Sequence, residues 1–151
     1  MHTPDSLNFL PPNAEAEPKR RRKRGKWIVV DDDPMTRAVI ALTLKEVMRI
    51  EVIECNSGDL AWDVWRTIPG IEGVVTDLHM PGMNGLDLSE RIHAHSPDAP
   101  IIMVTACPED ADWSDPRRIA IRRVVSKPFS CTDLVTAMRE TLQSTTWLEA
   151  A

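Results

Sequence analysis

Five short runs of β-branched and aliphatic residues recur along the chain at a nearly constant interval. Successive runs begin 23, 23, 28 and 22 residues apart. This interval is too long for β-hairpins, and it fits a strand, a loop, a helix of about three turns and a second loop. The pattern therefore predicts repeated βα units, with strands at residues 27–30, 50–53, 73–76, 101–104 and 123–126.

The segments between these runs carry helix signals. Pro34 suits the first turn of one helix, Asn84 can cap another, and Ser130 or Thr132 can cap the last. Residues 59–66 have the apolar spacing of a further helix. The apolar positions expected along the first helix are Ala38, Val39, Leu42 and Val47.

The gap before the last run gives the weakest helix signal. Pro108 suits a helix start, but Pro116 must end or kink the helix after about two turns. We therefore expect a short and disturbed fourth helix.

The first, third and fourth runs are apolar along their length, as expected for parallel strands covered by helices on both faces. We predict an α/β fold with a doubly wound, five-stranded parallel sheet in the strand order 2-1-3-4-5. In such sheets ligands bind at the carboxyl ends of the strands, near the switch point between strands 1 and 3. The residues that follow each strand therefore indicate the chemistry.

Charged and polar residues follow four of the five predicted strands. Strand 1 ends in Asp31-Asp32-Asp33, strand 3 in Asp77, strand 4 in Thr105-Ala106 and strand 5 in Lys127-Pro128. Strand 2 ends in the uncharged residues 55–58, as expected for an edge strand away from the site. Because Asp33 directly precedes Pro34, we interpret it as a helix N-cap rather than as a ligand.

The predicted cluster of carboxylates requires neutralisation. Asp31, Asp32 and Asp77 cannot all stay ionised at close range unless a cation binds or one of them takes up a proton. Oxygen ligands with room for water and a phosphate favour Mg²⁺. Asp77 is then available as a carboxylate nucleophile of the kind that forms an aspartyl phosphate. Lys127 offers an ammonium group to phosphoryl oxygens, Thr105 offers a hydroxyl donor, and Ala106 leaves space beside them.

Four motifs stand in order at the ends of predicted strands. They are VVDDDP at 29–34, TDLHMPGMNG at 76–85, VTA at 104–106 and SKPF at 126–129. Any one of them would be a weak signal, but all four in this order are highly specific. Over about residues 27 to 146 the chain resembles the receiver domain of bacterial two-component response regulators.

The resemblance implies a metal site and a phosphoacceptor. Asp31 and Asp32 would hold Mg²⁺ together with Asp77 and the backbone carbonyl of His79. Asp77 would accept a phosphoryl group from a histidine kinase or a histidine phosphotransfer protein. The implied fold is flavodoxin-like.

The resemblance also implies how the phosphoryl group is bound. Thr105, Ala106 and Lys127 would contact it, and Thr105 would supply the switch hydroxyl. The bond between the lysine and the following proline is commonly cis in this family, which here means Lys127-Pro128.

The sequence departs from the family pattern on one face. Val124 stands where the family has an aromatic residue whose inward swing reports phosphorylation, and Ala120-Ile121 replaces a usual Gly-Ala pair. The family typically dimerises or binds output partners through helix 4, strand 5 and helix 5, so homodimer formation is left open. We expect an altered output with unchanged phosphorylation chemistry. His79 and Cys107, each two positions after a site residue, are expected to tune the phosphoryl lifetime in a direction that the sequence does not assign.

Charge divides the chain into a tail and a body. The first 26 residues contain four prolines and few apolar side chains, and residues 19–26 carry a charge of +7 within a net charge of −5. We interpret 1–26 as a disordered tail and 27–147 as the receiver domain, with too little chain after it for an output domain. Because the body is acidic, contact with nucleic acid or a membrane is expected only through 19–26.

The cysteines and the hydropathy of the chain indicate the cellular compartment of the protein. The cysteines Cys55, Cys107 and Cys131 are an odd number without C-x-x-C spacing, which indicates reduced thiols and gives no sign of a thiolate metal site. No run approaches the roughly 18 apolar residues of a membrane span, and residues 1–18 lack the order of a secretory signal. We predict a cytoplasmic protein.

The sequence therefore predicts a single-domain, chemotaxis-regulator-like response regulator that signals by binding a downstream protein. It would be no enzyme beyond its own phosphorylation and dephosphorylation. One alternative is an interaction module that ignores phosphorylation, motivated by Val124 and the disturbed fourth helix, and another is binding driven by the basic tail. A hydrolase acting on an external phosphoester through Asp77 lacks a clear acid or base beyond His79.

Overall fold

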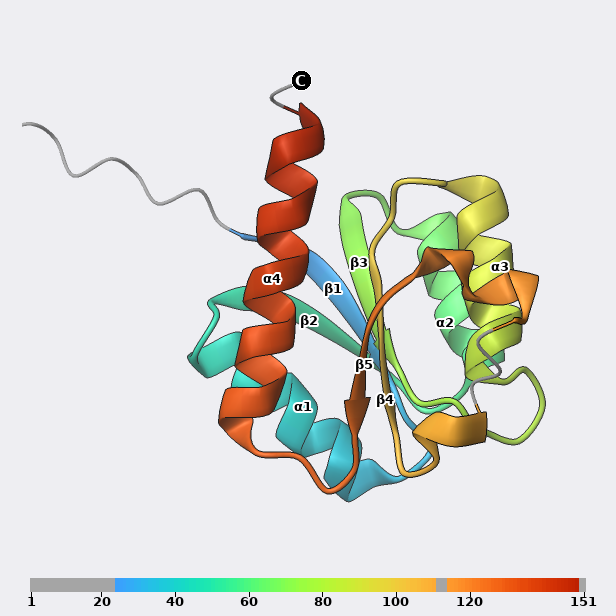
Figure 1. Ribbon diagram of the computed structural model, residues 1–151, viewed down its shortest axis with the longest axis horizontal. Helices are drawn as coiled ribbons and strands as arrows, with labels where there is room; N and C mark the ends of the chain where they lie inside the picture. The colour runs from blue at the N-terminus through green and yellow to red at the C-terminus, as the bar shows by residue number, and fades with distance from the viewer. Residues whose placement is uncertain (1–23, 111–113, 150–151) are drawn as a thin grey trace, which may run out of the picture.

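A five-stranded parallel sheet forms the centre of the computed structural model, which describes residues 24–110 and 114–149 (Figure 1). The strand order is β2-β1-β3-β4-β5, and all neighbouring strands pair in parallel. The predicted fold class and strand order are confirmed. The strands are β1 (Arg24–Val30), β2 (Ile50–Cys55), β3 (Ile71–Thr76), β4 (Ile101–Thr105) and β5 (Ile121–Ser126).

The start of β1 lies within the segment that the sequence assigned to the tail. Residues 24–26 belong to the strand, with Lys26 opposite both Glu51 and Ile71 in the neighbouring strands. The rest of the predicted tail, residues 1–23, lies outside the described residues.

Helices cover both faces of the sheet. The helices are α1 (Pro34–Glu46), α2 (Gly58–Thr67), α3 (Gly85–His95) and α4 (Cys131–Glu149). Helices α1 and α4 lie on one face, and α2 and α3 lie on the other (Figure 1). No helix in the described part of the chain has the length and apolar character of a membrane span.

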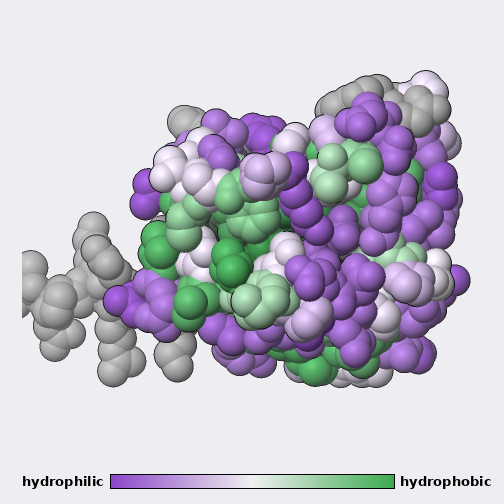
Figure 2. Space-filling view, turned by 90° about the horizontal axis from the view of Figure 1, so that it is seen from below, coloured by the Kyte–Doolittle hydropathy of each residue, from purple (hydrophilic) through white to green (hydrophobic). Residues whose placement is uncertain are grey.

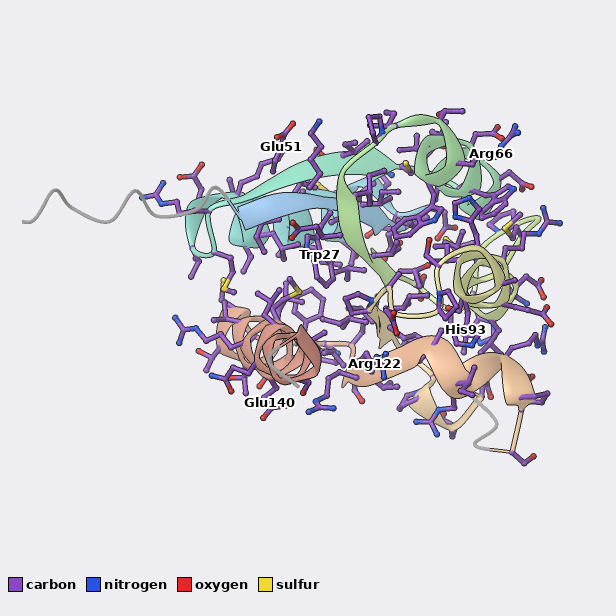
Figure 3. The ribbon with its side chains drawn as sticks, turned by 90° about the horizontal axis from the view of Figure 1, so that it is seen from above. Trp27, Glu51, Arg66, His93, Arg122 and Glu140 are labelled. Atoms are coloured by element: carbon purple, nitrogen blue, oxygen red, sulfur yellow. The ribbon has the colours of Figure 1, made fainter. Side chains whose placement is uncertain are left out.

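Alternation along β1 explains why both faces are covered. Trp27 and Val29 pack in the core beneath α1 and α4, whereas Ile28 and Val30 pack in the core beneath α2 and α3. Figure 3 shows Trp27 between the sheet and α4. A strand with apolar side chains on both sides is stable only as an inner strand of a layered α/β fold.

Local capping fixes where the helices begin, close to the strand ends. The Asp33 carboxylate accepts a hydrogen bond from the Thr36 N–H at 2.9 Å, so its predicted role as the N-cap of α1 is confirmed. Asn84 caps α3 as predicted. Ser130 and Asp133 exchange hydrogen bonds of 2.8 and 3.1 Å at the start of α4. Each cap contributes about 1 kcal/mol and fixes the residue at which its helix begins.

The buried face of α1 differs from the prediction. All four positions predicted to be apolar contacts are exposed, and the residues buried against the sheet and α4 include Ile40 and Leu44. The helix has apolar residues on more than one side, so periodicity alone could not identify the side that meets the sheet. The exposed positions are Ala38, Val39, Leu42 and Val47.

The prediction of a fourth α-helix is wrong for the described residues between β4 and β5. They form two short 3₁₀ helices, η1 (Pro108–Asp110) and η2 (Pro116–Ala120), while residues 111–113 are not described. Pro116 begins a helix instead of ending one, because proline lacks only an N–H that the first turn leaves unpaired anyway. Asp115 caps this turn by accepting a hydrogen bond from the Arg117 N–H at 2.9 Å.

Candidate functional site

Asp31 and Asp77 lie next to each other because their strands are neighbours. In the parallel pairing of β1 with β3, Val30 is opposite Thr76, and each aspartate is the next residue. The Asp77 N–H donates to the Val30 carbonyl at 2.9 Å, which extends the strand pairing to the site. Asp31 and Asp77 are buried and Asp32 is exposed, and oxygens from all three carboxylates lie within 4.8 Å of one another.

Lys127 brings a positive charge from the end of β5 into this cluster. Its Nζ lies 2.8 Å from Asp31 Oδ2 and 3.2 Å from Asp77 Oδ2. The Lys127 N–H donates to the Thr105 carbonyl at 2.8 Å, which holds the lysine backbone against the end of β4. The peptide bond between Lys127 and Pro128 is cis.

The pKa shifts at this site reflect burial and the contact between Asp31 and Lys127. Burial raises the pKa of Asp31 above its ordinary value, although hydrogen bonds from Lys127 and from the Asp33 N–H oppose the rise. Burial tends to lower the pKa of Lys127, but its hydrogen bond to Asp31 and the charges of Asp31 and Asp77 raise it above its ordinary value. One ammonium does not balance three carboxylates, so the cluster favours a further cation.

The backbone around Asp77 is held from two directions. Asp77 Oδ1 accepts a hydrogen bond from the Leu78 N–H at 2.7 Å, and the Thr76 hydroxyl donates to the Asp77 carbonyl at 2.9 Å. Gly85, the first residue of α3, packs directly on this turn. A Cβ at position 85 would clash with the Asp77 carbonyl oxygen, so a side chain there requires the backbone to shift. The start of α3 therefore positions the turn that carries Asp77.

Thr105 and Ala106 lie on the fourth strand's side of the site. Thr105 is buried, and its hydroxyl accepts a hydrogen bond from the Cys107 N–H at 3.2 Å. Ala106 is exposed and lines a hollow together with Lys127 and Phe129 of the following loop and Met35 and Val39 of α1. Figure 2 looks onto this edge of the molecule and shows hydrophobic residues gathered on its left side, where α1 lies, beside hydrophilic residues on the right.

Val124 occupies the position where the sequence comparison with the family expects an aromatic residue. It is half-buried in β5 and packs against a small cluster formed by Leu78, Leu86 and Met103. Leu78 follows Asp77 directly, so this cluster connects the site to β5 without an aromatic side chain.

A second group of polar side chains lies at the rim of the site. His79 Nε2 is 2.9 Å from Asp110 Oδ2, and both side chains are more than half exposed. The Cys107 thiol is close by, and one donor atom from each of the three residues lies within 4.8 Å of the others. The sequence singled out His79 and Cys107 but missed Asp110, which the predicted helix placed elsewhere. The i, i+3 spacing of Cys107 and Asp110 was the available signal.

The hard oxygen donors of Asp31, Asp32 and Asp77 fit Mg²⁺. They share one edge of the sheet with Lys127 and Thr105, as the sequence predicted. A model of the response regulator receiver domain matches residues 27–139. The chain belongs to the response regulator receiver domain family.

The relatives of this receiver domain include chemotaxis proteins. The chain is 34% identical over 107 residues to a chemotaxis protein CheY homolog of Campylobacter jejuni, covering 70% of this chain and 82% of that protein. It is 32% identical over 107 residues to the chemotaxis protein CheY1 of Helicobacter pylori, covering 70% and 86% of the two chains.

A solved structure agrees with the fold of this receiver domain. The response regulator protein TrrA of Thermotoga maritima, in complex with Mg²⁺ and BeF, superimposes with a TM-score of 0.69 at 28% identity, covering 77% of this chain and 97% of that one. The present chain is thus a CheY-like receiver domain of two-component signalling, a family whose members bind Mg²⁺ in an acidic pocket and interact with histidine kinases and downstream targets. Its members are signalling proteins with no catalytic role beyond autodephosphorylation.

Proposed function

We propose that this chain is a phosphorylation-dependent switch that accepts a phosphoryl group on Asp77 from a histidine kinase or a histidine phosphotransfer protein. The observation that carries the proposal is the position of the Lys127 ammonium, which contacts both Asp31 and Asp77 at the carboxyl edge of the sheet. A carboxylate beside a fixed cation and two further carboxylates suits metal-assisted phosphoryl transfer.

In this proposal each residue of the site has a separate role in phosphoryl transfer. Asp31, Asp32, Asp77 and the His79 carbonyl would hold Mg²⁺, which when bound neutralises charge on phosphoryl oxygens. An Asp77 oxygen forms the new bond to phosphorus as the bond from phosphorus to the donor's nitrogen or oxygen breaks, and the leaving group keeps that electron pair. Lys127 and the Thr105 hydroxyl bind oxygens of the transferred group, and Ala106 leaves room for them.

The output in this proposal is a change in protein binding. Phosphorylation need only shift an equilibrium between two conformations by a few kcal/mol, which an added dianion with new hydrogen bonds can supply. In this proposal the receiver domain acts in the cytoplasm by binding a downstream protein. His79 and Cys107 at the rim would set the phosphoryl lifetime.

Intact-protein mass spectrometry tests this proposal. The full chain is incubated with Mg²⁺ and a small acyl phosphate, beside Asp77→Asn and the exposed control Asp98→Asn. The wild type and the control should each gain one base-labile phosphoryl group, and Asp77→Asn should gain none. A phosphoryl group on Asp77→Asn, or none on a folded wild type given a cognate kinase, would contradict the proposal.

A second candidate is an interaction module whose binding ignores phosphorylation, and the aliphatic Val124 favours it. NMR amide spectra recorded with and without Mg²⁺ and beryllofluoride separate the two candidates. The switch predicts shifts that extend from Asp77 through the Leu78 cluster into β5 and η2. The constitutive module predicts shifts confined to the residues around Asp77.

A further inference from the structure

The rim residues His79, Cys107 and Asp110 combine three donor types, and a magnesium site does not use two of them, the imidazole nitrogen and the thiol sulfur. They offer an imidazole nitrogen, a thiol sulfur and a carboxylate oxygen. Borderline-soft donors of this kind select zinc over magnesium or calcium. We propose that these three residues form a second metal site, specific for Zn²⁺ and separate from the acidic cluster of Asp31, Asp32 and Asp77.

Local structure explains why Cys107 and Asp110 face the same way. The Asp110 N–H donates to the Cys107 carbonyl at 3.1 Å, which closes the single turn of η1. In a 3₁₀ helix, side chains at positions i and i+3 are eclipsed. The thiol and the carboxylate therefore form one side of the site before any metal binds.

His79 completes the set from the neighbouring loop. It follows β3, and Cys107 follows β4, and these strands are adjacent in the sheet, so their loops meet at one edge. His79 Nε2 already lies 2.9 Å from Asp110 Oδ2. The C-x-x-C rule applied to the sequence could not reveal this site, because its ligands come from two loops.

The distances suit a tetrahedral zinc ion after a small adjustment. With zinc–ligand bonds of about 2.0–2.3 Å, tetrahedral ligand atoms lie roughly 3.3–3.8 Å apart. The three donor atoms lie within 4.8 Å of one another. The His79 and Asp110 side chains are exposed, so they can rotate to bring the donor atoms closer by the roughly 1 Å that a tetrahedral site requires. A water molecule would supply the fourth ligand.

The surrounding charge also favours a cation. Desolvation and the charges of Asp110 and Glu109 raise the pKa of the Cys107 thiol above its ordinary value. The thiol is therefore protonated in the free protein, and zinc binding transfers this proton to the solvent as the Zn–S bond forms. The imidazole and the carboxylate bind without changing their covalent structure.

Isothermal titration with Zn²⁺ in saturating Mg²⁺ tests this site, because Mg²⁺ occupies the acidic cluster. The full-length chain should bind one zinc ion. Cys107→Ser and His79→Gln should each weaken binding at least tenfold, as should Asp110→Asn. The matched controls Cys131→Ser and His95→Gln remove an exposed thiol and an exposed imidazole elsewhere, and they should bind zinc as the wild type does.

A second measurement reports on the ligands themselves. Substituted Co²⁺ should give a thiolate charge-transfer band in the wild type and in Cys131→Ser, and no band in Cys107→Ser. Hydrogen exchange at residues 78–82 and 105–110 should slow when zinc is added. Equal zinc affinity in the wild type and Cys107→Ser, or no binding in saturating Mg²⁺, would overturn the proposal. Neither measurement requires phosphorylation, so failure of the zinc proposal would not affect the proposed role of Asp77.

Discussion

At the scale of single residues, the site places like charges together in a way that favours ligand binding over stability. Asp31 is fully buried, and its pKa is raised chiefly by that burial, with a contribution from the charge of Asp77. Lys127 contacts both carboxylates but cannot neutralise all three. A protein that keeps such a cluster without a bound cation does so at a cost in folding free energy.

Removing one charge should therefore stabilise the metal-free protein. We expect Asp77→Asn to raise the free energy of unfolding by about 1 kcal/mol in the presence of a chelator, because it relieves repulsion with Asp31. Saturating Mg²⁺ should remove or reverse this advantage, since the wild type binds the ion more tightly. Urea denaturation in both conditions measures the effect, and Asp98→Asn, on the exposed surface, should change the result by less than about 0.5 kcal/mol. Lower stability of Asp77→Asn in chelator would contradict this account.

The raised pKa of Asp31 also predicts a pH dependence for magnesium binding. Protonated Asp31 cannot ligate the ion, so Mg²⁺ affinity should fall as the pH drops through this raised pKa, and it should level off above it. Because the pKa lies above the ordinary value, the fall should begin at a higher pH than for an exposed carboxylate. Calorimetry between about pH 4 and 7 checks this. Asp31→Asn should bind weakly throughout, with a shallower dependence on pH.

At the scale of elements, the contact between α3 and the turn after β3 sets the position of Asp77. Gly85 lies against the Asp77 carbonyl, where no Cβ fits, and its N–H donates to the Leu78 carbonyl at 2.8 Å. The start of α3 and Asp77 therefore move together.

Gly85→Ala should consequently destabilise the protein by about 2 kcal/mol, although alanine is the better helix former. It should also weaken Mg²⁺ binding, because the turn that carries Asp77 must shift. Gly70 has a φ of +81° with nothing near its missing side chain, so Gly70→Ala should cost about 1 kcal/mol from backbone strain alone and leave Mg²⁺ affinity unchanged. Thermal unfolding and calorimetry of both variants check this. A Gly85→Ala protein as stable as the wild type would show that the contact relaxes at no cost.

Elements whose signals are local were predictable from the sequence. The strands follow from their apolar runs, and Asp33 and Asn84 could be recognised as caps because capping depends on residues within one turn. The buried face of α1 could not be predicted, because Val39 and Ile40 are equally apolar and only the position of α4 decides between them. The structure of the segment after Pro108 depends on packing: Arg117 in η2 bonds Asp87 of α3 at 2.7 Å, a contact across 30 residues.

In the candidate site, too, some residues could be predicted from the sequence and others could not. Asp31, Asp77 and Lys127 each follow a strand and Thr105 ends one, so the parallel topology predicted their convergence. Asp110 was not predicted as a neighbour of His79, because the 3₁₀ turn that places it has no strong sequence signal.

At the scale of the whole molecule, a ligand at the site contacts residues at the ends of four of the five strands. The site residues follow β1, β3, β4 and β5, so any ligand that contacts them all connects most of the sheet. Binding at such a site should therefore raise the free energy of unfolding of the whole domain.

Mg²⁺ together with beryllofluoride should raise the melting temperature of the full chain by about 10 °C when both are near a hundredfold above their dissociation constants. Asp77→Asn should show no shift from beryllofluoride, because it lacks the carboxylate to which the fluoride complex attaches. Differential scanning calorimetry provides the measurement. An equal shift in both proteins would place the bound anion away from Asp77.

The pairing of Asp31 with Lys127 joins residues 96 positions apart in the chain. During synthesis, Asp31 and Asp77 leave the ribosome well before Lys127, so a nascent chain that has built the first three strands still lacks the ammonium group. We expect such a chain not to accept a phosphoryl group on Asp77. Competence to signal would then arise only when the last strand has joined the sheet, and the phosphorylated form would report a fully folded molecule.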